Sequence, residues 1–242
     1  MQLVQLQRRA VDSIKRHALT LSRSSSRAQA GILTEYLWAE EGAESAALQR
    51  TAAAAAPAWL GKLIANQLAD EERHASLIRA RLGELGAATD RPPPALAKAK
   101  LWWLERAVAP YRSAFAAGEI VVMVAIAAQF EATGVRVFDR HLGVLAPDDP
   151  LYAIIGSIVA DERRHAKSCA AALEKQVTPH ERFLLAELRE RIAGVDRAFG
   201  VTIAVGFWCL VAARVLRDRK PHEGGARSNP EGIAKVNRRG AA

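Results

Sequence analysis

Two short stretches of the sequence carry the same set of residues that can bind a metal ion. The first stretch reads LADEERHASL at residues 68–77, and the second reads VADERRHAKS at residues 159–168. Each contains Glu-x-x-His, and a further Glu lies 31 residues before each of these two Glu residues. The residues that coincide at this offset of 91 positions (162 minus 71) are Glu71 with Glu162, His74 with His165 and, upstream, Glu40 with Glu131.

This pattern is typical of a metal site that holds two ions. Residues three apart on an α-helix lie on one face, so the Glu and His of each pair can address the same point. Two such pairs, with one Glu from each of two further helices, form the ligand set of a di-iron or di-manganese site in a helix bundle. Carboxylates suit hard cations, and six ligands leave coordination positions open for dioxygen. The predicted ligands are Glu40, Glu71, His74, Glu131, Glu162 and His165.

A single Glu-x-x-His is usually a solvated helix face, so the pattern needs support from its surroundings. Glu131 gives that support, because it is the only acid in the apolar run VVMVAIAAQFEATGV. Burying an unpaired carboxylate is costly, and a metal ion removes that cost. We expect a few further residues to assist the ligands from outside: Asp70 and Asp161 by accepting a hydrogen bond from a ligand histidine, and Tyr36 and Glu44, one turn either side of Glu40, by lining the site.

The composition predicts that helices position these residues. Half of the 242 residues are hydrophobic, and Ala, Leu, Glu and Arg recur almost throughout, as helices favour. GAATDRPPPA is the clearest break, and it separates two helical hairpins. In the first half, the predicted helices are a basic amphipathic helix at 1–22, a helix at 31–55 that carries Glu40, and a helix at 57–85. A short helix with Trp102 and Trp103 follows the break, and Pro110 opens the next helix, at 111–145. Asp149 and Pro150 open the following helix, and the capping box Thr178–Glu181 opens the last one, which runs to about Leu216. The expected fold is all-α: a four-helix bundle with one long crossover, the ferritin-like arrangement, plus an N-terminal and a C-terminal helix.

The net charge of +8 is concentrated at the two ends of the chain. Residues 1–30 hold six Lys or Arg against one Asp, and residues 217–242 hold seven against three acids, which leaves −1 for residues 31–216. Basic ends suit an anionic membrane surface or nucleic acid, and solubilising tails explain them equally well. No aromatic-interleaved basic patch or helix-turn-helix pattern is present, so no specific nucleic-acid partner is expected. We divide the chain into a basic N-terminal segment (1–30), a helical domain (31–216) and a basic tail (217–242).

The location of the protein follows from three features. Two widely spaced cysteines without Cys-x-x-Cys predict a reducing cytoplasm. The charged N-terminus does not resemble a cleavable signal peptide. The apolar stretch 198–213 is about 24 Å long as a helix, short of a hydrocarbon core of about 30 Å. It therefore either packs on the bundle or lies on a membrane surface, and its candidate membrane or substrate-access residues are Phe199, Ile203, Phe207 and Trp208.

Over about residues 31–216 the chain resembles the ferritin-like di-iron carboxylate proteins, and among them it is most similar to the demethoxyubiquinone hydroxylase group. AEEGAESA around Glu40 is similar to the Gly-Glu-Tyr-Gly-Ala of that group, RPPPALAKAKLWW to its Arg-Pro…Leu-Trp segment, and GEIVVMVAIAAQFE to the run before its third-helix Glu. The chain differs from the group at two places. Before the first Glu the group has Asp-His, where this chain has Leu37-Trp38. After the third-helix Glu the group has His-His-Tyr, where this chain has Arg136-Val137-Phe138.

The resemblance implies a cytoplasmic enzyme on the inner face of the cell membrane. Such a protein uses two iron ions and dioxygen to hydroxylate an apolar, quinone-like substrate, 5-demethoxyubiquinol, in ubiquinone synthesis. Manganese is the alternative metal, and a homo-oligomer is left open. A ferroxidase or a rubrerythrin-like protein that handles iron or peroxide needs the same six ligands and is the alternative function, although the chain has no rubredoxin-like Cys-x-x-Cys module.

Overall fold

The protein is an all-α bundle, as predicted. The computed structural model describes residues 2–43, 50–51, 56–89 and 94–219, and these contain helices and no strand. The elements are α1 (Gln2–Ser22), α2 (Ser26–Trp38), the π-helical turn η1 (Ala39–Ala43), α4 (Ala58–Glu84), α5 (Ala95–Val108), the 3₁₀ turn η2 (Ala109–Tyr111), α6 (Glu119–Leu142), α7 (Pro150–Gln176), the 3₁₀ turn η3 (Pro179–Glu181) and α8 (Arg182–Arg219).

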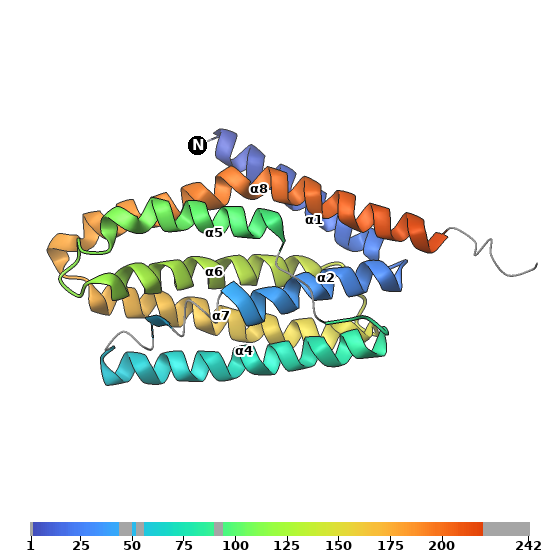
Figure 1. Cartoon of the computed structure of the whole chain (residues 1–242), viewed down its shortest axis with the longest axis horizontal. Coiled ribbons are helices and arrows are strands. Elements are labelled where there is room, and N and C mark those ends of the chain that lie inside the picture. Colours follow the sequence, from blue (N-terminus) through green and yellow to red (C-terminus); the bar gives the residue numbers. More distant parts are fainter. Residues whose placement is uncertain (1, 44–49, 52–55, 90–93, 220–242) are drawn as a thin grey trace, which may run out of the picture.

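Four helices run side by side, and three more cover one side of them. Figure 1 shows α2, α4, α6 and α7 as the bundle, with α6 and α7 forming an antiparallel hairpin. The crossover between the two hairpins contains α5, which packs against α8. α1 also packs against α8, at an angle, so α1, α5 and α8 form an outer layer. This order matches the expected bundle with one long crossover and an additional helix at each end.

Polar side chains at the helix starts explain several boundaries. The Asp149 carboxylate accepts a hydrogen bond from the Leu151 N–H at 2.9 Å, and Pro150 is the first residue of α7. Thr178 and Glu181 form the predicted capping box before α8. These groups satisfy backbone N–H groups that have no partner within the helix, and both predicted starts are confirmed.

Three predicted boundaries were wrong. α2 begins at Ser26 instead of Gly31, because the Ser25 hydroxyl accepts from the Ala28 N–H at 3.0 Å and caps the helix five residues earlier. Pro57 lies immediately before α4. The third bundle helix begins at Glu119: Pro110 lies in η2, and Gly118 has a φ of 70°, a left-handed conformation that ends one segment and starts another. The predicted end of the 31–55 helix lies outside the described residues.

The apolar core consists of two clusters, one toward each end of the bundle. One contains the start of α4, with Leu60 and Ile64, and the end of α7, with Leu173. The other contains the end of α4, with Ile78 and Leu82, together with parts of α1, α2 and α8. The central turns of α4, α6 and α7 lie between these clusters, and they carry the acidic and histidine residues of the predicted site.

Candidate metal centre

Six acidic and histidine side chains form a buried polar layer midway along the bundle. Each of the bundle helices contributes: η1, which continues α2, carries one, α6 carries one, and α4 and α7 carry two each. All six are at most 4% exposed. They are the residues that share the 91-position offset: Glu40, Glu71, His74, Glu131, Glu162 and His165.

The six residues form two overlapping groups that could each hold a metal ion. One ligand atom from each member of a group lies within 4.8 Å of those from the other members. The first group adds Glu40 and His74 to a shared pair, and the second adds Glu131 and His165 to the same pair. The shared residues are Glu71 and Glu162, so these two carboxylates are placed to bridge two neighbouring ions.

Distances to the imidazole nitrogens support this division. His74 Nδ1 lies 3.3 Å from Glu40 Oε2 and 3.7 Å from Glu71 Oε2. His165 Nδ1 lies 3.3 Å from Glu71 Oε1 and 3.4 Å from Glu131 Oε2. Glu71 therefore turns one oxygen toward each histidine, which is the orientation a bridging carboxylate requires.

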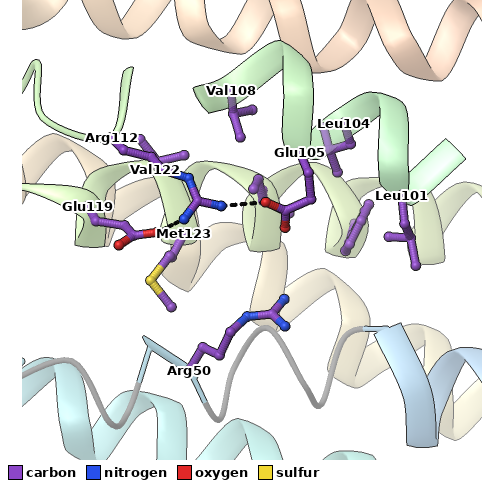
Figure 2. A pocket seen from close by; sticks show the side chains of 11 residues that line it. Arg50, Leu101, Leu104, Glu105, Val108, Arg112, Glu119, Val122 and Met123 are labelled. Carbon is purple, nitrogen blue, oxygen red and sulfur yellow. Dashed lines mark hydrogen bonds and ion pairs between the residues drawn. The ribbon is translucent and has the colours of Figure 1, made fainter. Parts of the chain in front are cut away.

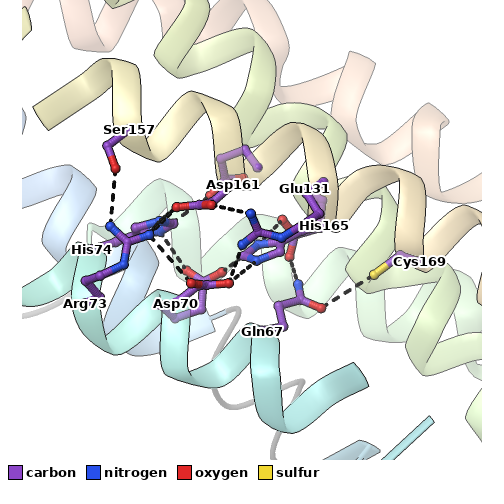
Figure 3. Close-up of polar contacts among 12 residues, drawn as sticks. Gln67, Asp70, Arg73, His74, Glu131, Ser157, Asp161, His165 and Cys169 are labelled. Atoms are coloured by element: carbon purple, nitrogen blue, oxygen red, sulfur yellow. Dashed lines mark hydrogen bonds and ion pairs between the residues drawn. The ribbon is translucent and has the colours of Figure 1, made fainter. Parts of the chain in front are cut away.

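Each histidine is held on its outer side by an aspartate from the opposite helix. His74 Nε2 of α4 lies 3.2 Å from Asp161 Oδ2 of α7, and His165 Nε2 of α7 lies 3.1 Å from Asp70 Oδ2 of α4 (Figure 3). This arrangement directs both Nδ1 atoms to the interior of the site. Outer hydrogen bonds of this kind fix the orientation and tautomer of a metal-bound histidine. The predicted role of Asp70 and Asp161 agrees with this placement. The sequence analysis did not predict that each aspartate reaches the histidine of the other helix.

Two arginines complete a charged cluster around these aspartates. Arg164 lies 2.6 Å from Asp70 and 2.6 Å from Asp161, and Arg73 also pairs with Asp161. Partial burial opposes ionisation of Asp161, but hydrogen bonds from His74, Arg164 and Arg73 outweigh it and lower its pKa. Asp161 is therefore ionised at neutral pH and accepts the imidazole N–H.

Inside the site, the carboxylates are too crowded to be stable as four charges without a cation. Burial raises the pKa of Glu131, and the charge of Glu71 raises it further. Burial tends to lower the pKa of His165, but Glu131, Glu71 and Asp70 raise it to about 10. The negative charge of neighbouring carboxylates contributes to both pKa shifts, and this charge attracts a cation.

The donor atoms fit a pair of divalent metal ions. Both Glu71 oxygens, Glu131 Oε2 and His165 Nδ1 are buried and form no hydrogen bond with any residue that the structure describes. Unsatisfied buried polar atoms of this kind require an explanation, and coordination to a metal provides one. Four carboxylates carry four negative charges, which two divalent cations would neutralise. The buried Glu and His residues could therefore hold metal, and their types do not identify which metal.

Three residues that sequence reasoning missed support this site. The Gln67 side-chain amide, one turn before Glu71, donates to Glu131 Oε1, and its oxygen lies 3.7 Å from the Cys169 sulfur (Figure 3). Gly134, one turn after Glu131, leaves room for a neighbouring ligand: a Cβ atom at this position would lie 2.2 Å from Glu162 Oε2. A glutamine and a glycine have no metal-binding signature, so only the packing of the helices reveals them.

Glu40 lies in the π-helical turn that continues α2, a local widening of the helix often found at functional sites. Glu44, the other predicted acid on this segment, lies outside the described residues. Tyr36 is buried one turn before Glu40, and its hydroxyl lies 3.2 Å from His141 Nδ1. Burial lowers the pKa of His141 to about 4, so this histidine is neutral at physiological pH.

An apolar cavity of about 490 Å³ lies beside the polar layer, bounded by α1, α2, α5, α6 and α8. Two of its lining residues, Ala39 and Phe130, are the direct chain neighbours of Glu40 and Glu131. Tyr36 also lines this cavity. The cavity is large enough for a small organic molecule.

A second cavity of about 330 Å³ lies between α5 and α6 and shares the lining residues Leu101 and Phe130 with the first. Figure 2 shows Arg112 at its edge, paired with Glu105 and with Glu119. Charged residues make up a larger share of its lining than of the lining of the first cavity, so it is the less suitable of the two for an apolar molecule.

The candidate membrane or access residues on α8 lie on two sides of the helix. Ile203 and Phe207 line the larger cavity. Trp208 Nε1 donates to His17 Nδ1 of α1 at 2.9 Å, and Phe199 is half-buried. The exposed large apolar residues of the outer layer are Leu3, Val4 and Leu6 on α1, Leu96, Trp102 and Trp103 on α5, and Phe183, Val201, Val205, Leu210 and Leu216 on α8.

Two helical segments, Glu119–Leu142 and Pro179–Asp218, are long and apolar enough to cross a membrane by length and composition. The first carries Glu131 within the bundle core, and the cores of soluble proteins contain helices that pass the same test. The second is much longer than the stretch 198–213 that sequence analysis judged too short to span, because α8 is continuous from Arg182 to Arg219.

Comparisons of the chain with protein-family models, with characterised proteins and with solved structures gave no match. The structure itself shows a helical bundle with clustered buried Glu and His residues that could hold a metal site, which is compatible with a ferritin-like di-iron fold.

Proposed function

We propose that this protein is a di-iron carboxylate monooxygenase that hydroxylates an apolar molecule. One observation carries the proposal: a buried set of four carboxylates and two imidazoles lies beside an apolar cavity of about 490 Å³. The ligand set alone would serve a ferroxidase or a peroxide-handling protein equally well. The cavity favours an enzyme with an organic substrate, because handling iron or peroxide requires no apolar chamber.

The residues of the chain have distinct tasks in this proposal. Glu71 and Glu162 would be shared by the two ions, while Glu40 with His74, and Glu131 with His165, would each hold one ion. When bound and reduced, the iron pair supplies the electrons to dioxygen, so that one oxygen atom enters the substrate and the other leaves as water. A donor outside this chain would return two electrons to the iron pair after each turnover, and the substrate supplies the other two electrons that dioxygen takes up.

The protein around the ions orients the ligands and excludes water. Asp161 and Asp70 hold the histidine rings, and Gln67 holds Glu131. The two apolar clusters close the layer above and below. The larger cavity, whose lining is mainly apolar, would hold an apolar substrate near Glu40 and Glu131.

The substrate and its source are part of the same proposal. The sequence resemblance favours a quinone-like ring, 5-demethoxyubiquinol, and such molecules dissolve in membranes. The exposed Trp102 and Trp103 on α5, and Val201 and Val205 on α8, form an apolar surface on the layer that covers the cavity. With the basic α1, this layer suits docking on the anionic inner face of the cell membrane.

The test is anaerobic loading with ferrous iron, followed by addition of a chemical reductant, a quinone-like substrate and ¹⁸O-labelled dioxygen. We expect one labelled oxygen atom in the product and no turnover by Glu71→Ala. Glu41→Ala is the matched control, because Glu41 is exposed on the same segment as Glu40 and pairs with Arg79. Rapid oxidation of ferrous iron without any labelled organic product would contradict the proposal and favour a ferroxidase.

A further inference from the structure

The wall of the larger cavity combines apolar side chains with an excess of cations. Leu19, Ile203, Phe207 and similar residues make up most of the surface. The charged residues that also line it are three cations, Lys15, Lys100 and Arg140, and one acid, Glu35. A cavity for a neutral apolar molecule needs no such group, since desolvating a charge is costly.

Two of the three cations already have an acidic partner outside the cavity wall. Lys100 pairs with Asp196 of α8. Arg140 Nε lies 2.7 Å from Asp12 Oδ1 of α1. The first ion pair joins α5 to α8 within the outer layer, and the second joins α1 of that layer to α6 of the bundle. Both pairs therefore have a structural reason to exist whether or not the cavity binds anything.

Lys15 is different. It is half-buried on α1, and among the described residues it makes no hydrogen bond and no ion pair. The charges that act on it most strongly come from Arg140, Lys100 and Arg136, against the single negative charge of Asp196. Cations therefore outnumber acids around the Lys15 ammonium group, and no described acid forms an ion pair with it, although Glu35 lies on the same cavity wall.

We propose that the larger cavity binds an apolar molecule that carries one carboxylate, with the carboxylate paired to Lys15 and the apolar body extending toward Ala39 and Phe130. This inference rests on the proposed oxygenase with an apolar substrate, but it replaces the quinone-like ring that the sequence resemblance favours. A neutral quinone ring would leave Lys15 without a partner, whereas an apolar chain or ring with an acid group would satisfy it. Charge-assisted hydrogen bonds of this kind are the stronger ones in proteins, and the apolar lining takes up the rest of the ligand.

The electrostatics at Lys15 agree with this assignment. Burial lowers its pKa to about 8, and the neighbouring cations lower it further than Asp196 raises it. An arriving carboxylate would reverse that effect, because an opposite charge favours the protonated amine. Binding of the carboxylate would then offset the unfavourable burial of the Lys15 ammonium group near other cations in the free protein.

The test compares two probes of equal chain length, dodecanoate and dodecanol, by isothermal titration calorimetry below their aggregation limits. The full-length protein is measured both metal-free and iron-loaded. We expect dodecanoate to bind at least about tenfold more tightly than dodecanol in both forms, the size expected of a hydrogen bond to a charged group. The metal-free arm excludes a carboxylate bound to iron, and it reads out binding even if the protein proves to have no oxygenase activity.

Substitutions then assign the preference to one residue. Lys15→Gln should bring the two probes to similar affinity, while Lys15→Arg should retain the preference. Lys98→Gln is the matched control, because Lys98 is exposed on the adjacent α5 and does not line the cavity. Equal affinity of the wild-type protein for the two probes would overturn the proposal, and so would a preference that persists in Lys15→Gln.

Discussion

At the scale of single residues, the site depends on how a few side chains hold one another. Each histidine turns Nδ1 inward, and its Nε2 is held by an aspartate from the opposite helix, Asp161 for His74 and Asp70 for His165. Because α4 and α7 run in opposite directions, the same Asp-Glu-x-x-His order on both helices brings each Asp beside the histidine of the other. The repeated motif therefore produces two equivalent aspartate–histidine contacts, one on each side of the site.

Asp161→Ala should weaken metal binding without removing a ligand. The variant leaves His74 in place but frees its ring to rotate and to adopt the other tautomer. Loss of an outer hydrogen bond of this type lowers metal affinity about 10–100-fold, which a competition titration with a chelator would measure. Glu72→Gln, an exposed acid on α4, is the control and should bind metal like the wild type. Unchanged affinity in Asp161→Ala would show that His74 is held by other means.

Gly134→Ala should disturb the metal site by a steric effect, without changing any ligand. The added methyl group would lie 2.2 Å from Glu162 Oε2 and displace that carboxylate. We expect at least a tenfold loss of metal affinity, approximately that of an altered ligand orientation, with an unfolding temperature no lower than that of the wild type, because alanine favours a helix over glycine. In the control, Gly61→Ala, the methyl group meets no atom within 4 Å, and metal binding should not change. Equal metal affinity in Gly134→Ala and Gly61→Ala would contradict the assigned position of Glu162.

The residues that sequence reasoning found and those it missed differ in kind. The six candidate ligands share a register and a chemistry, so a repeated spacing of 91 residues was sufficient to select them. Gln67 and Gly134 act only through their position in the packed bundle. Gln67 is one turn from Glu71 on the same helix but reaches Glu131 on another. No spacing rule could have predicted that contact.

At the scale of elements, the bundle places a polar layer between two apolar clusters. The helix pattern and capping residues predicted most helices, including α7 and the start of α8. The prediction of α6 was wrong at its start, because a proline after Ala109 resembles a first helical turn. The conformation of Gly118 and the 3₁₀ turn η2 set the actual boundary, and such backbone geometry depends on how the crossover packs against α6.

The contact between Tyr36 and His141 joins α2 to α6 and makes stability depend on pH. Burial holds the pKa of His141 at about 4 in the folded protein, against 6.5 for an ordinary histidine. As the pH falls from about 6.5 to 4, the unfolded chain takes up a proton that the folded protein does not, so the free energy of unfolding decreases. The loss attributable to this residue is about 3 kcal/mol at the acidic end of that range.

Chemical denaturation at several pH values would measure this effect. His141→Gln can retain a hydrogen bond to Tyr36 but cannot take up a proton, so its stability should fall less steeply between pH 6.5 and 4 than that of the wild type. Groups other than His141 titrate in both proteins and cancel in the difference. Parallel curves for the two proteins would rule out His141 as the cause.

At the scale of the whole molecule, the outer layer of α1, α5 and α8 covers the cavity and presents apolar side chains to the surroundings. Trp102 and Trp103 are each 54% exposed. Sequence analysis left open whether the apolar face of α8 contacts the bundle or a membrane. Ile203 and Phe207 of that face line the cavity, whereas the neighbouring Val201 and Val205 are exposed. A membrane contact would therefore use the exposed tryptophans and valines and leave Phe207 inside.

Trp102→Ser with Trp103→Ser should release the protein from anionic vesicles in a flotation assay while its metal content stays the same. Each aromatic side chain that becomes buried in the membrane contributes about 1.5–3 kcal/mol, so the partition coefficient should fall more than about tenfold. Tyr152→Ser is the control, because this exposed aromatic residue lies on α7, outside the outer layer. Equal flotation of the double variant and the wild type would refute a membrane contact through α5.

The most direct test of the metal site is the iron content of each chain after anaerobic loading with ferrous iron, measured by mass spectrometry and by Mössbauer spectroscopy. We predict two irons per chain with magnetic coupling between them, as expected for ions that share carboxylate bridges. Glu71→Ala should lose both irons because it removes a bridge, Glu40→Ala should retain the iron held by Glu131 and His165, and the exposed Glu41→Ala should retain both. A wild-type protein without iron, or a Glu71→Ala variant that keeps two coupled irons, would contradict the assigned site.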